Sequence, residues 1–488
     1  MINNNKENPM VNSIQDSHVE ITDISQLQLT LNSQRVQFNK NPYADYETRI
    51  ADLKKLKKMV VDNQDAFATA MGNDFGHRSV DDSRIGDIMT TVMGINYSIS
   101  KLKKWMKPKS RHVGILFQPA KAHVMMQPKG VIGIVTPWNY PLFLSLGPLT
   151  AALAAGNRAM IKMSEYTPAT GKLLAELMAT IFPQDKVAIV GGDIKVASAF
   201  TSLKFDHIFF TGSTPVGKIV MKSAAENLIP VTLELGGKSP TIIDKDINID
   251  TAVARMILGK TLNAGQTCVA PDYIFCPRDR VDELTESLRN VYQKMFPTVR
   301  DNADATSVVN QGQYNRLHGL LEDAEGKGAK IIPLNETIEK NSQRKLPLTV
   351  VLNTTDDMKV MQEEIFGPVL PILPYDSIDE VIDYINANER PLALYINSYD
   401  KKFQQKILKH THSGGACIND ATFHVVIDDL PFGGVGASGM GNYHGEEGFT
   451  TFSHPKAVFS RGRISFSHLL FPPFGTAIHK LVFKLFIR

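Results

Sequence analysis

Short apolar runs alternate with amphipathic stretches between residues 131 and 213, and this alternation limits the folds open to the chain more than any other feature. The apolar runs read VIGIVT, AMIKM, KVAIVGG and FDHIFFTGS. Amphipathic segments from about residue 142 and over residues 170–182 lie between them. Uninterrupted apolar strands joined by helices are typical of a parallel sheet covered on both faces. The sequence therefore predicts an α/β fold built from βαβ units.

A second α/β series follows Gly237. It comprises the apolar segment PTIIDKD, a helix near residues 249–262, the strand YIFCP and a helix over residues 282–295. The chain has 488 residues, which exceeds the size at which one hydrophobic core keeps growing. We therefore expect two large α/β domains that meet near residue 235, with a smaller accessory element.

The composition favours a small-molecule ligand. Basic and acidic residues are scattered along the chain and their formal balance is only +3, which argues against nucleic acid as a partner. Cys268, Cys276 and Cys417 match neither a disulfide framework nor a zinc site, so we expect a reducing cytoplasm and no metal. Residues 1 to about 20 are polar, which predicts a mobile arm without a signal peptide, and no apolar run is long enough to predict a membrane span.

Cys268 is the first candidate catalytic group. It lies in NAGQTCVAP, a polar turn that contains glycine and precedes the strand DYIFCP. A cysteine attacks as its thiolate, and with an ordinary pKa of about 8.5 it benefits from helix N-terminal amides or another positive field. The alternative is a small buried apolar residue, which is the role we expect of Cys276 and Cys417.

Glu234 is the candidate general base. It stands between Leu233 and Leu235 in VTLELGGKSP, directly before a pair of glycines that allows close backbone approach. Apolar neighbours tend to raise the pKa of a carboxyl group, which suits a base that takes a proton from water near neutral pH. The alternative is a surface glutamate at the end of a strand.

Asn139 is the candidate oxyanion donor. In TPWNYP it follows a predicted strand and precedes a helix that begins near a proline. An amide N–H at this place can stabilise negative charge as it develops on oxygen, an effect worth about 3 kcal/mol or more. Asparagine is also a common turn residue beside proline, which is the alternative explanation.

Two segments are candidates for cofactor binding. FFTGSTPVGK places Gly212 and Gly217 between an apolar strand and a helix, where backbone amides can bind phosphate. The spacing is not GxGxxG, so an ordinary βα turn remains the alternative. MIKMSE carries Lys162 and Glu165 at the end of another apolar run, where they either hold ribose hydroxyls or face solvent.

These motifs together resemble the aldehyde dehydrogenase family. TPWNYP, IKMSE, FFTGSTPVG, LELGGK, NAGQTC, EEIFGP and PFGGVGASG occur in the family's order and spacing, and the resemblance covers roughly residues 30–460. The 95-residue step from Asn139 to Glu234 and the 34-residue step from Glu234 to Cys268 are similar to those of the class 3 branch, which includes coniferyl and fatty aldehyde dehydrogenases.

The resemblance implies an oxidation of aldehydes to carboxylic acids through a covalent thioester. Cys268 would attack the aldehyde carbon, while the side-chain amide of Asn139 and the backbone amide of Cys268 stabilise the oxyanion. Hydride would pass to the nicotinamide, and Glu234 would activate the water that hydrolyses the thioester.

The resemblance also implies the cofactor residues. Lys162 and Glu165 match contacts to the adenosine ribose, and Glu364 and Phe366 match contacts to the nicotinamide ribose and ring. The pyrophosphate turn would contain Gly212, Ser213, Thr214, Val216 and Gly217. Since an acidic Glu165 should repel a 2′-phosphate, we expect NAD as the cofactor, with NADP as the alternative that class 3 relatives often accept.

The resemblance also suggests a substrate class and two alternative functions. The residues that match the family's aldehyde tunnel are mostly apolar or aromatic, which favours aromatic or medium- to long-chain aliphatic aldehydes: Tyr140, Thr267, Val269, Phe423 and Phe432. One rival is a CoA-acylating dehydrogenase, against which the presence of Glu234 argues. The other is a catalytically silent structural or binding homologue.

The implied architecture is a Rossmann-like cofactor domain over residues 1–235, an α/β catalytic domain over residues 236–420 and an oligomerisation segment with a tail over residues 421–488. A hairpin over residues 111–127, where polar and apolar residues alternate, would join the oligomerisation element of a homodimer. The apolar tail HLLFPPFGTAIHKLVFKLFIR is expected to pack on the body or at a subunit boundary, with peripheral membrane contact as the alternative.

Overall fold

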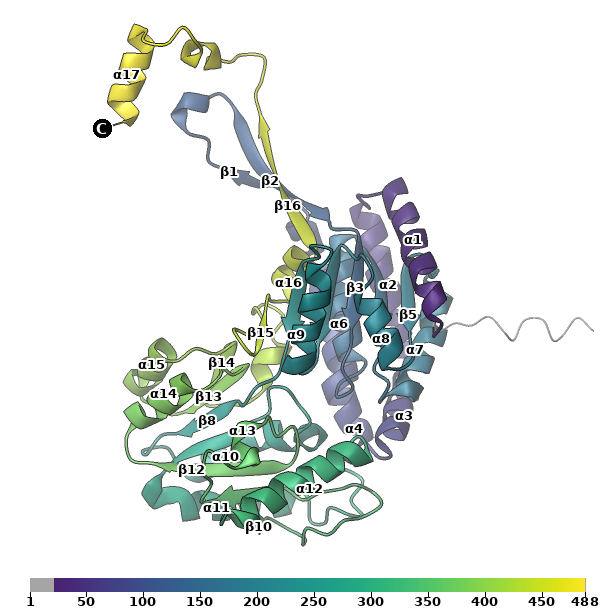
Figure 1. Cartoon of the computed structure of the whole chain (residues 1–488), viewed down its shortest axis with the longest axis vertical. Helices are drawn as coiled ribbons and strands as arrows, with labels where there is room; N and C mark the ends of the chain where they lie inside the picture. The colour runs from purple at the N-terminus through teal and green to yellow at the C-terminus, as the bar shows by residue number, and fades with distance from the viewer. Residues whose placement is uncertain (1–21, 488) are drawn as a thin grey trace, which may run out of the picture.

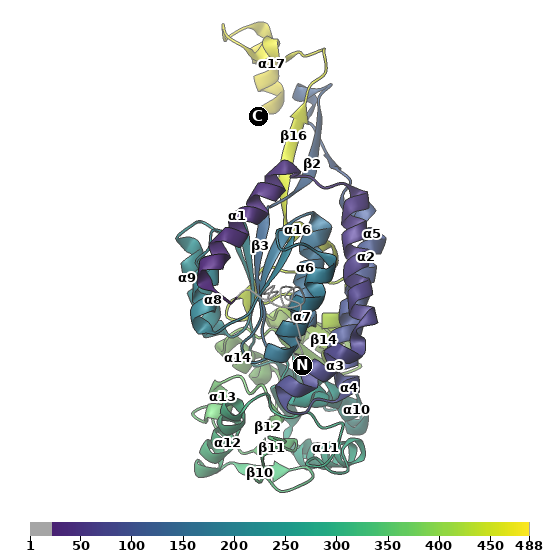
Figure 2. The ribbon, with the colours of Figure 1, turned by 90° about the vertical axis from the view of Figure 1, so that its right-hand side faces the viewer.

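The computed structural model describes residues 22–487, so the predicted N-terminal arm lies outside the described residues. Two α/β layers are stacked along the long axis of the molecule, and a narrow three-stranded ribbon extends beyond one end (Figure 1). The same stack is visible from the side in Figure 2.

The first α/β layer contains a six-stranded sheet. Five strands are parallel and only the short edge strand β15 is antiparallel. In sheet order the strands are β15 (Gly439–Met440), β7 (Val231–Glu234), β6 (His207–Thr211), β3 (Val131–Val135), β4 (Arg158–Lys162) and β5 (Val187–Val190). The structure thus confirms the parallel sheet predicted from the apolar runs.

Helices cover both faces of this sheet because alternate strand residues point to opposite sides. Ile132, Ile134 and Ile161 pack with α2 (Tyr46–Asp62), α5 (Thr90–Trp105), α6 (Phe143–Ala155) and α7 (Pro168–Ile181). The intervening residues Val131 and Met160 pack with α1 (Ile24–Lys40), α8 (Ile194–Thr201) and α9 (Thr214–Ala225). Two separate apolar cores result. Shorter helices α3 (Gln64–Phe75) and α4 (Val80–Ser83), with a π-helical turn over Arg84–Met89, precede α5.

The second α/β layer contains a seven-stranded sheet in which only β10 is antiparallel. In sheet order the strands are β10 (Lys330–Pro333), β11 (Thr349–Leu352), β12 (Val369–Tyr375), β9 (Tyr273–Pro277), β8 (Pro240–Ile243), β13 (Ala393–Asn397) and β14 (Gly415–Ile418). The helices packed on it are α10 (Ile249–Thr261), α11 (Val281–Met295), α12 (Gln311–Gly326), α13 (Lys359–Gln362), α14 (Ile378–Ala387) and α15 (Lys401–His410). The second predicted α/β series is therefore also present. Glu234 ends a strand of the first sheet and Pro240 begins one of the second, so the chain crosses between the layers within the LELGGK motif.

The ribbon beyond the first layer is an antiparallel sheet of β1 (Lys109–Arg111), β2 (Lys121–Pro128) and β16 (Ser453–Ser460). The strand pair expected over residues 111–127 exists with shifted bounds, because a 3-10 turn at Ile115–Phe117 occupies its middle. Beyond α16 (Gly445–Thr451) and β16 the chain forms a 3-10 turn at Ser467–Leu470 and then α17 (Ala477–Phe486).

The tail does not pack on the body of its own chain, so that part of our expectation was wrong, while packing at a subunit boundary stays a prediction. Of the residues in α17 only His479 is buried, and the helix stands at the far end of the molecule (Figure 1). Apolar composition alone predicts burial, but the rigid ribbon carries this segment away from both cores. Across residues 22–487 no helix has both the length and the hydropathy that a membrane span requires.

Candidate active site

A cavity of about 860 Å3 lies between the two α/β layers. The carboxyl ends of β6 and β7 line one side, and residues of β9, α14 and the loop before β12 line the other. Its size is typical of small-molecule and cofactor sites. Eight residues singled out in the sequence line it: Asn139, Gly212, Ser213, Thr214, Glu234, Cys268, Glu364 and Phe366. The fold therefore brings the three candidate catalytic groups into one space.

The loop that carries Cys268 is shaped by consecutive residues in the left-handed backbone region. Asn263, Ala264 and Gly265 have φ angles of 51°, 53° and 71°. A Cβ atom on Gly265 would lie only 2.7 Å from the carbonyl oxygen of Gly367. Glycine is required at this point both for its φ and for the close approach. The turn fixes the direction in which the chain leaves α10.

Gln266 anchors the same loop. Its side-chain Nε2 donates to the carbonyl oxygens of Asn263 at 2.9 Å and Ser307 at 3.1 Å. Its backbone carbonyl oxygen accepts a hydrogen bond from Nδ2 of Asn139 at 3.1 Å. The amide of Asn139 is thereby held against the loop of Cys268, across more than a hundred residues of sequence.

The half-buried Cys268 thiol is neutral at physiological pH in this arrangement. Burial raises its pKa to about 12, and the nearby carboxyl groups of Glu364 and Glu234 act in the same direction. Backbone amides of the loop oppose the shift. Because a thiolate is the attacking species, positive charge brought into the cavity or protonation of the two carboxyl groups would activate the residue.

Glu234 ends β7 and is 3% exposed. Among residues 22–487, neither of its carboxyl oxygens has a hydrogen-bond partner. Burial raises its pKa well above the ordinary value, as its apolar neighbours in the sequence predict. A buried carboxylate without a partner is a strong proton acceptor, so Glu234 is suited to take a proton from water.

Glu364 explains the first glycine of LELGGK. Its carboxyl group lies so close to Gly236 that a Cβ atom there would be 2.2 Å from Oε2. Burial raises the pKa of Glu364 to about 8, with a further contribution from Asp272. Phe366 follows at a φ of 50°, and its ring meets the edge of Trp138 at 5.2 Å between centroids.

A buried ion cluster beneath the site was not predicted from the sequence. Arg78 forms ion pairs with Asp87 at 2.9 Å and Asp82 at 3.7 Å, and all three are buried. Arg78 also donates to the backbone oxygen of Asn139 at 3.0 Å. Asp82 accepts the backbone amide of Asn263 at 2.7 Å. The cluster therefore ties the Asn139 loop to the turn that precedes Cys268.

Asp87 extends this connection to α6. Its Oδ1 accepts the amides of Leu142 at 3.0 Å and Phe143 at 2.9 Å, which satisfies donors at the start of the helix. Burial raises the pKa of Asp87 to about 6, against the lowering effect of Arg78. The sequence signal that existed was Arg78 and Asp82 one helical turn apart, a spacing that is usually an exposed pair.

The segment around α9 offers an anion site. Ser213 is the N-cap residue and its side chain makes no capping bond, while Gly212, Ser213 and Thr214 line the cavity. Unsatisfied amides at the start of this 12-residue helix favour a phosphate group. Val216 and Gly217 do not line the cavity: Val216 is 45% exposed, and Gly217 lets the helix approach Leu235, 2.7 Å from where its Cβ would lie.

Lys162 and Glu165 are not part of the cavity lining. Lys162 is buried at the end of β4, and its ammonium group donates to the carbonyl oxygens of Met163 at 2.7 Å and Gly192 at 2.8 Å. Glu165 is exposed. The described cavity thus contains the phosphate and nicotinamide candidates but not the two adenosine-ribose candidates.

The five substrate candidates also lie outside this cavity lining. Tyr140 and Thr267 share a hydrogen bond of 2.9 Å between their hydroxyl oxygens. Val269 is buried, and its carbonyl oxygen accepts the hydroxyl of Tyr395. Phe432 is buried against His444, with ring centroids 5.3 Å apart, whereas Phe423 is 46% exposed. His444 is a polar group that our sequence analysis missed, and its ring nitrogens have no hydrogen-bond partner in the described part of the chain.

The two remaining cysteines lie in strands outside the cavity lining. Cys276 is buried in β9 and Cys417 is half-buried in β14, where its Sγ lies 3.2 Å from Nδ1 of His424. Burial raises the pKa of both thiols. In the part of the chain from residue 22 to residue 487, no group of three or more His, Cys, Asp or Glu residues is arranged to bind a metal.

Comparisons with known proteins agree with the resemblance seen in the motifs. Residues 8–458 match the model of the Aldehyde dehydrogenase family. A "Probable coniferyl aldehyde dehydrogenase" of Pseudomonas aeruginosa is 53% identical over 466 residues, which is 96% of this chain and 97% of that protein.

Solved structures show the same fold. The substrate-bound state of Staphylococcus aureus AldH has a TM-score of 0.90 at 36% identity, covering 96% of this chain and 100% of its own. A Mycobacterium tuberculosis aldehyde dehydrogenase complexed with NAD+ has a TM-score of 0.82 at 29% identity, covering 94% and 92%. The predicted fold class is therefore confirmed.

The environment of Cys268 predicts its reactivity without ligands. The alkylation rate by iodoacetamide should rise continuously from neutral pH to about pH 10, because the thiol pKa lies higher still. Glu364→Gln removes a group whose negative charge raises this pKa, and it should accelerate the reaction above about pH 8, where Glu364 is ionised. Alkylation is measured by mass spectrometry of the Cys268 peptide, with the Cys276 peptide as internal control. A plateau near the ordinary pKa of cysteine would contradict the assignment.

The ion cluster predicts a large effect of Arg78→Met. Asp82 and Asp87 would remain buried without a cation, at a cost of about 3–5 kcal/mol in the free energy of unfolding. Urea denaturation measures this loss. Combining Arg78→Met with Asp87→Asn removes one of the uncompensated charges and should recover part of the lost stability. The recovery should be incomplete, because the backbone oxygen of Asn139 still lacks its hydrogen-bond donor. Equal losses in the single and double variants would refute the charge explanation.

Proposed function

Because this chain belongs to the aldehyde dehydrogenase family and is an NAD(P)-dependent enzyme of that family, we propose that it oxidises apolar aldehydes to carboxylic acids, aromatic aldehydes of the coniferyl type first. Medium- to long-chain aliphatic aldehydes are the second choice. The observation that carries the proposal is the convergence of Cys268, Glu234 and Asn139 on one cavity. The name of the Pseudomonas aeruginosa relative supports the aromatic class.

The first half of the proposed reaction forms a carbon–sulfur bond. Cys268 first loses its proton to solvent, which positive charge brought into the cavity would favour. The thiolate then attacks the carbonyl carbon, and the electron pair of the C=O bond moves to oxygen. The Cys268 backbone amide and the Asn139 side chain donate to this oxyanion, Asn139 exchanging its present bond to Gln266 for one to the substrate. When bound, NAD(P)+ would supply the acceptor for the hydride of the substrate carbon, and loss of that hydride would leave a thioester on Cys268.

The second half releases the acid. Glu234 takes a proton from a water molecule as the water oxygen attacks the thioester carbon, and the carbon–sulfur bond breaks to return the thiolate. The high pKa of Glu234 favours proton uptake, and the absence of competing hydrogen-bond partners leaves both oxygens free to bind that water.

The residues present fit a dinucleotide. The uncapped start of α9 would bind the pyrophosphate through Gly212, Ser213 and Thr214, while Glu364 would accept hydrogen bonds from the nicotinamide ribose and Phe366 would contact the ring. Lys162 and Glu165 would take part once the adenosine end is bound. NAD is the proposed cofactor because Glu165 disfavours a 2′-phosphate, and the Mycobacterium tuberculosis relative is complexed with NAD+.

The proposed assembly is a cytoplasmic homodimer joined through the three-stranded ribbon. In one chain most of β16 is exposed, and an edge strand with free backbone groups is suited to pair with another chain. We assign residues 1–235 to cofactor binding, 236–420 to catalysis and 421–488 to assembly and the tail. A CoA-acylating reaction is the rival function, and the buried base Glu234 argues against it.

The first test measures reduced-cofactor formation with NAD and NADP separately, without CoA. The panel contains coniferaldehyde, benzaldehyde, hexanal, decanal and a charged semialdehyde. Coniferaldehyde should be turned over with the highest kcat/KM and the semialdehyde with the lowest. Cys268→Ala should abolish turnover, whereas Cys417→Ala should retain it. Turnover only when CoA is added would replace the hydrolytic reaction with the acylating one, and none under either condition would leave the silent homologue.

Glu234→Gln separates the two halves of the reaction. The variant should still produce a burst of reduced cofactor close to one equivalent, because Cys268 and Asn139 are intact. Steady-state turnover should then fall by about 10²-fold or more, because the thioester waits for an unassisted water. Stopped-flow absorbance gives both phases. A steady-state rate equal to that of the wild type would remove Glu234 from the mechanism.

A further inference from the structure

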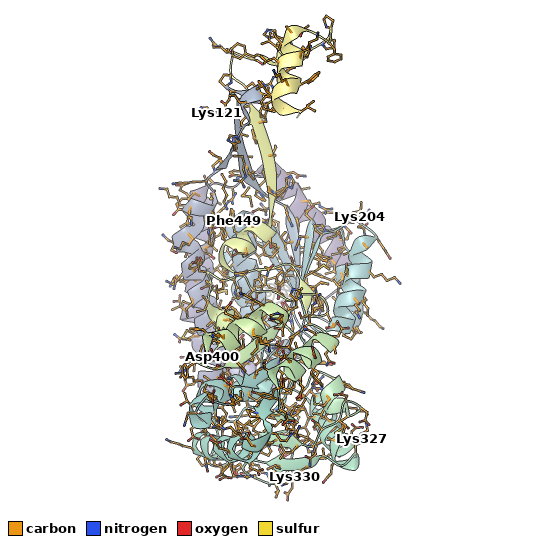
Figure 3. All side chains as sticks on the ribbon, turned by 90° about the vertical axis from the view of Figure 1, so that its left-hand side faces the viewer. Lys121, Lys204, Lys327, Lys330, Asp400 and Phe449 are labelled. Atoms are coloured by element: carbon orange, nitrogen blue, oxygen red, sulfur yellow. The ribbon has the colours of Figure 1, made fainter. Side chains whose placement is uncertain are left out.

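A second cavity, of about 510 Å3, lies where the three-stranded ribbon leaves the first α/β layer. Its size is within the range of small-molecule sites. Figure 3 labels Lys204, two residues before Asp206, at about the level where the ribbon begins, and Lys121 farther out along the ribbon. The lining residues come from α1, β2 and the loops after them, from β16, and from the loops before β6 and β7: Phe38, Pro42, Gln127, Pro128, Lys129, Asp206, Pro230 and His454.

This cavity is separate from the one that contains Cys268. Strand β6 begins at His207, next to the second cavity, and ends at Thr211, which lines the catalytic cavity. Successive residues of a strand are spaced by roughly 3.3 Å, so the two cavities lie at opposite ends of this strand. Among the described residues, none lines both cavities. A ligand in the second cavity would therefore leave the catalytic cavity open.

Lys129 is a half-buried cation in the lining of the second cavity. Its Nζ donates to Nδ1 of His207 at 3.0 Å, and Nε2 of the same ring donates to the hydroxyl oxygen of Thr232 at 2.9 Å. Among residues 22–487 no carboxylate oxygen lies within 4.0 Å of the Lys129 ammonium group. His207 does not balance this charge, because burial and the charge of Lys129 hold the pKa of its ring well below the ordinary value. Burial also lowers the pKa of Lys129, as expected of an ammonium group without a counter-ion.

Asp206, the acidic residue of the lining, is already engaged with other groups. Its Oδ2 accepts the backbone amide of Val131 at 2.8 Å, and its Oδ1 lies 3.7 Å from a guanidinium nitrogen of Arg35. This ion pair leaves Lys129 as the unbalanced charge. The cavity is therefore suited to a ligand with a single negative charge, whereas a dianion would also be repelled by the carboxylate of Asp206.

The remaining walls favour an apolar ligand body. Phe38, Pro42, Pro128 and Pro230 present ring carbons to the cavity, and their side chains contain no hydrogen-bonding group. Burying apolar ligand surface against such walls is favourable. An ammonium group beside apolar walls is the combination that recognises an organic carboxylate, because the charged end and the apolar body each find a partner.

We propose that the cavity at the base of the ribbon binds an apolar monocarboxylate, with Lys129 as the cation that recognises its carboxylate group. One carboxylate oxygen would accept an N–H of Lys129 that His207 leaves free, and the apolar body would lie against the proline and phenylalanine rings. The acid released by the proposed oxidation belongs to this class. That link to the product rests on the proposed function, whereas the site itself does not.

The test is isothermal titration calorimetry of the purified full chain with trans-cinnamate, without cofactor or aldehyde. Lys129→Met should remove one binding site per chain or weaken it at least about tenfold, because a charge-assisted hydrogen bond is lost. Lys121→Met, which removes an exposed lysine of the ribbon, is the matched control and should leave binding unchanged. Cinnamate bound only in the catalytic cavity would titrate identically in the wild type and in Lys129→Met, and this result would overturn the proposal. Failure of the proposed oxidation would not change the outcome, since no reaction takes place.

Two further comparisons separate the charge from the shape of the ligand. Cinnamamide, which has the same shape without the charge, should bind at least about tenfold more weakly than cinnamate. Phe38→Ser should weaken cinnamate binding, whereas Val36→Ser, at a position 55% exposed on the same helix, should not. Equal affinity for cinnamide's parent acid and for inorganic phosphate would overturn the apolar class of ligand.

The thermal stability of Lys129→Met provides the folding control. This variant should keep the Tm of the wild type, because it removes a half-buried charge that has no counter-ion among the described residues. A binding site lost at unchanged Tm supports direct recognition by Lys129. Equal affinity of the wild type for cinnamate and cinnamamide would instead overturn the role of its ammonium group.

Discussion

The buried contact of Arg78 with Asp82 and Asp87 is the interaction on which the geometry of the site depends. It joins the helical segment before α5, the start of α6, the Asn139 loop and the turn ahead of Cys268. Charges removed from water are costly unless each finds partners in a fixed geometry. The cluster therefore restricts how these four segments can be arranged. The side chain of Gln266 also fixes this loop, because it donates to the carbonyl oxygens of Asn263 and Ser307 and accepts the backbone amide of Val309.

Proton affinity within the cavity is controlled mainly by burial. Cys268, Glu234 and Glu364 each have a raised pKa, and desolvation is the largest cause for all three. The anionic form of either glutamate would also raise the pKa of the thiol, so the protein surroundings favour neutral groups. Positive charge brought into the cavity would shift this balance toward the thiolate. The proposed deacylation uses the same low dielectric, which makes Glu234 a stronger base than a solvated carboxylate.

The cavity and the three-stranded ribbon are separated along the long axis of the molecule. The cavity lies between two sheets, where strand ends from both layers supply rigid positions for its groups. The ribbon and tail extend from the other end of the first layer (Figure 1). Since the ribbon is formed by β1, β2 and β16, residues more than 300 positions apart in the chain become one surface.

The sequence by itself determined the parallel strands and the motif residues, while only the tertiary structure decided which distant groups meet. Val131–Val135 and His207–Thr211 were predictable because uninterrupted apolar runs report burial on both faces of a strand. Cys268, Glu234 and Asn139, which line one cavity, could be proposed as candidates because glycine turns and apolar neighbours are local signals. The contact of Arg78 with the Asn139 loop was not predictable from the sequence. Two opposite charges one helical turn apart usually form an exposed pair, and only the tertiary packing buries Arg78 and Asp82. The position of Lys162 outside the described cavity and the exposure of α17 were also not predictable. Local composition indicates whether a segment is apolar or polar, but the sheet topology determines which other residues it contacts.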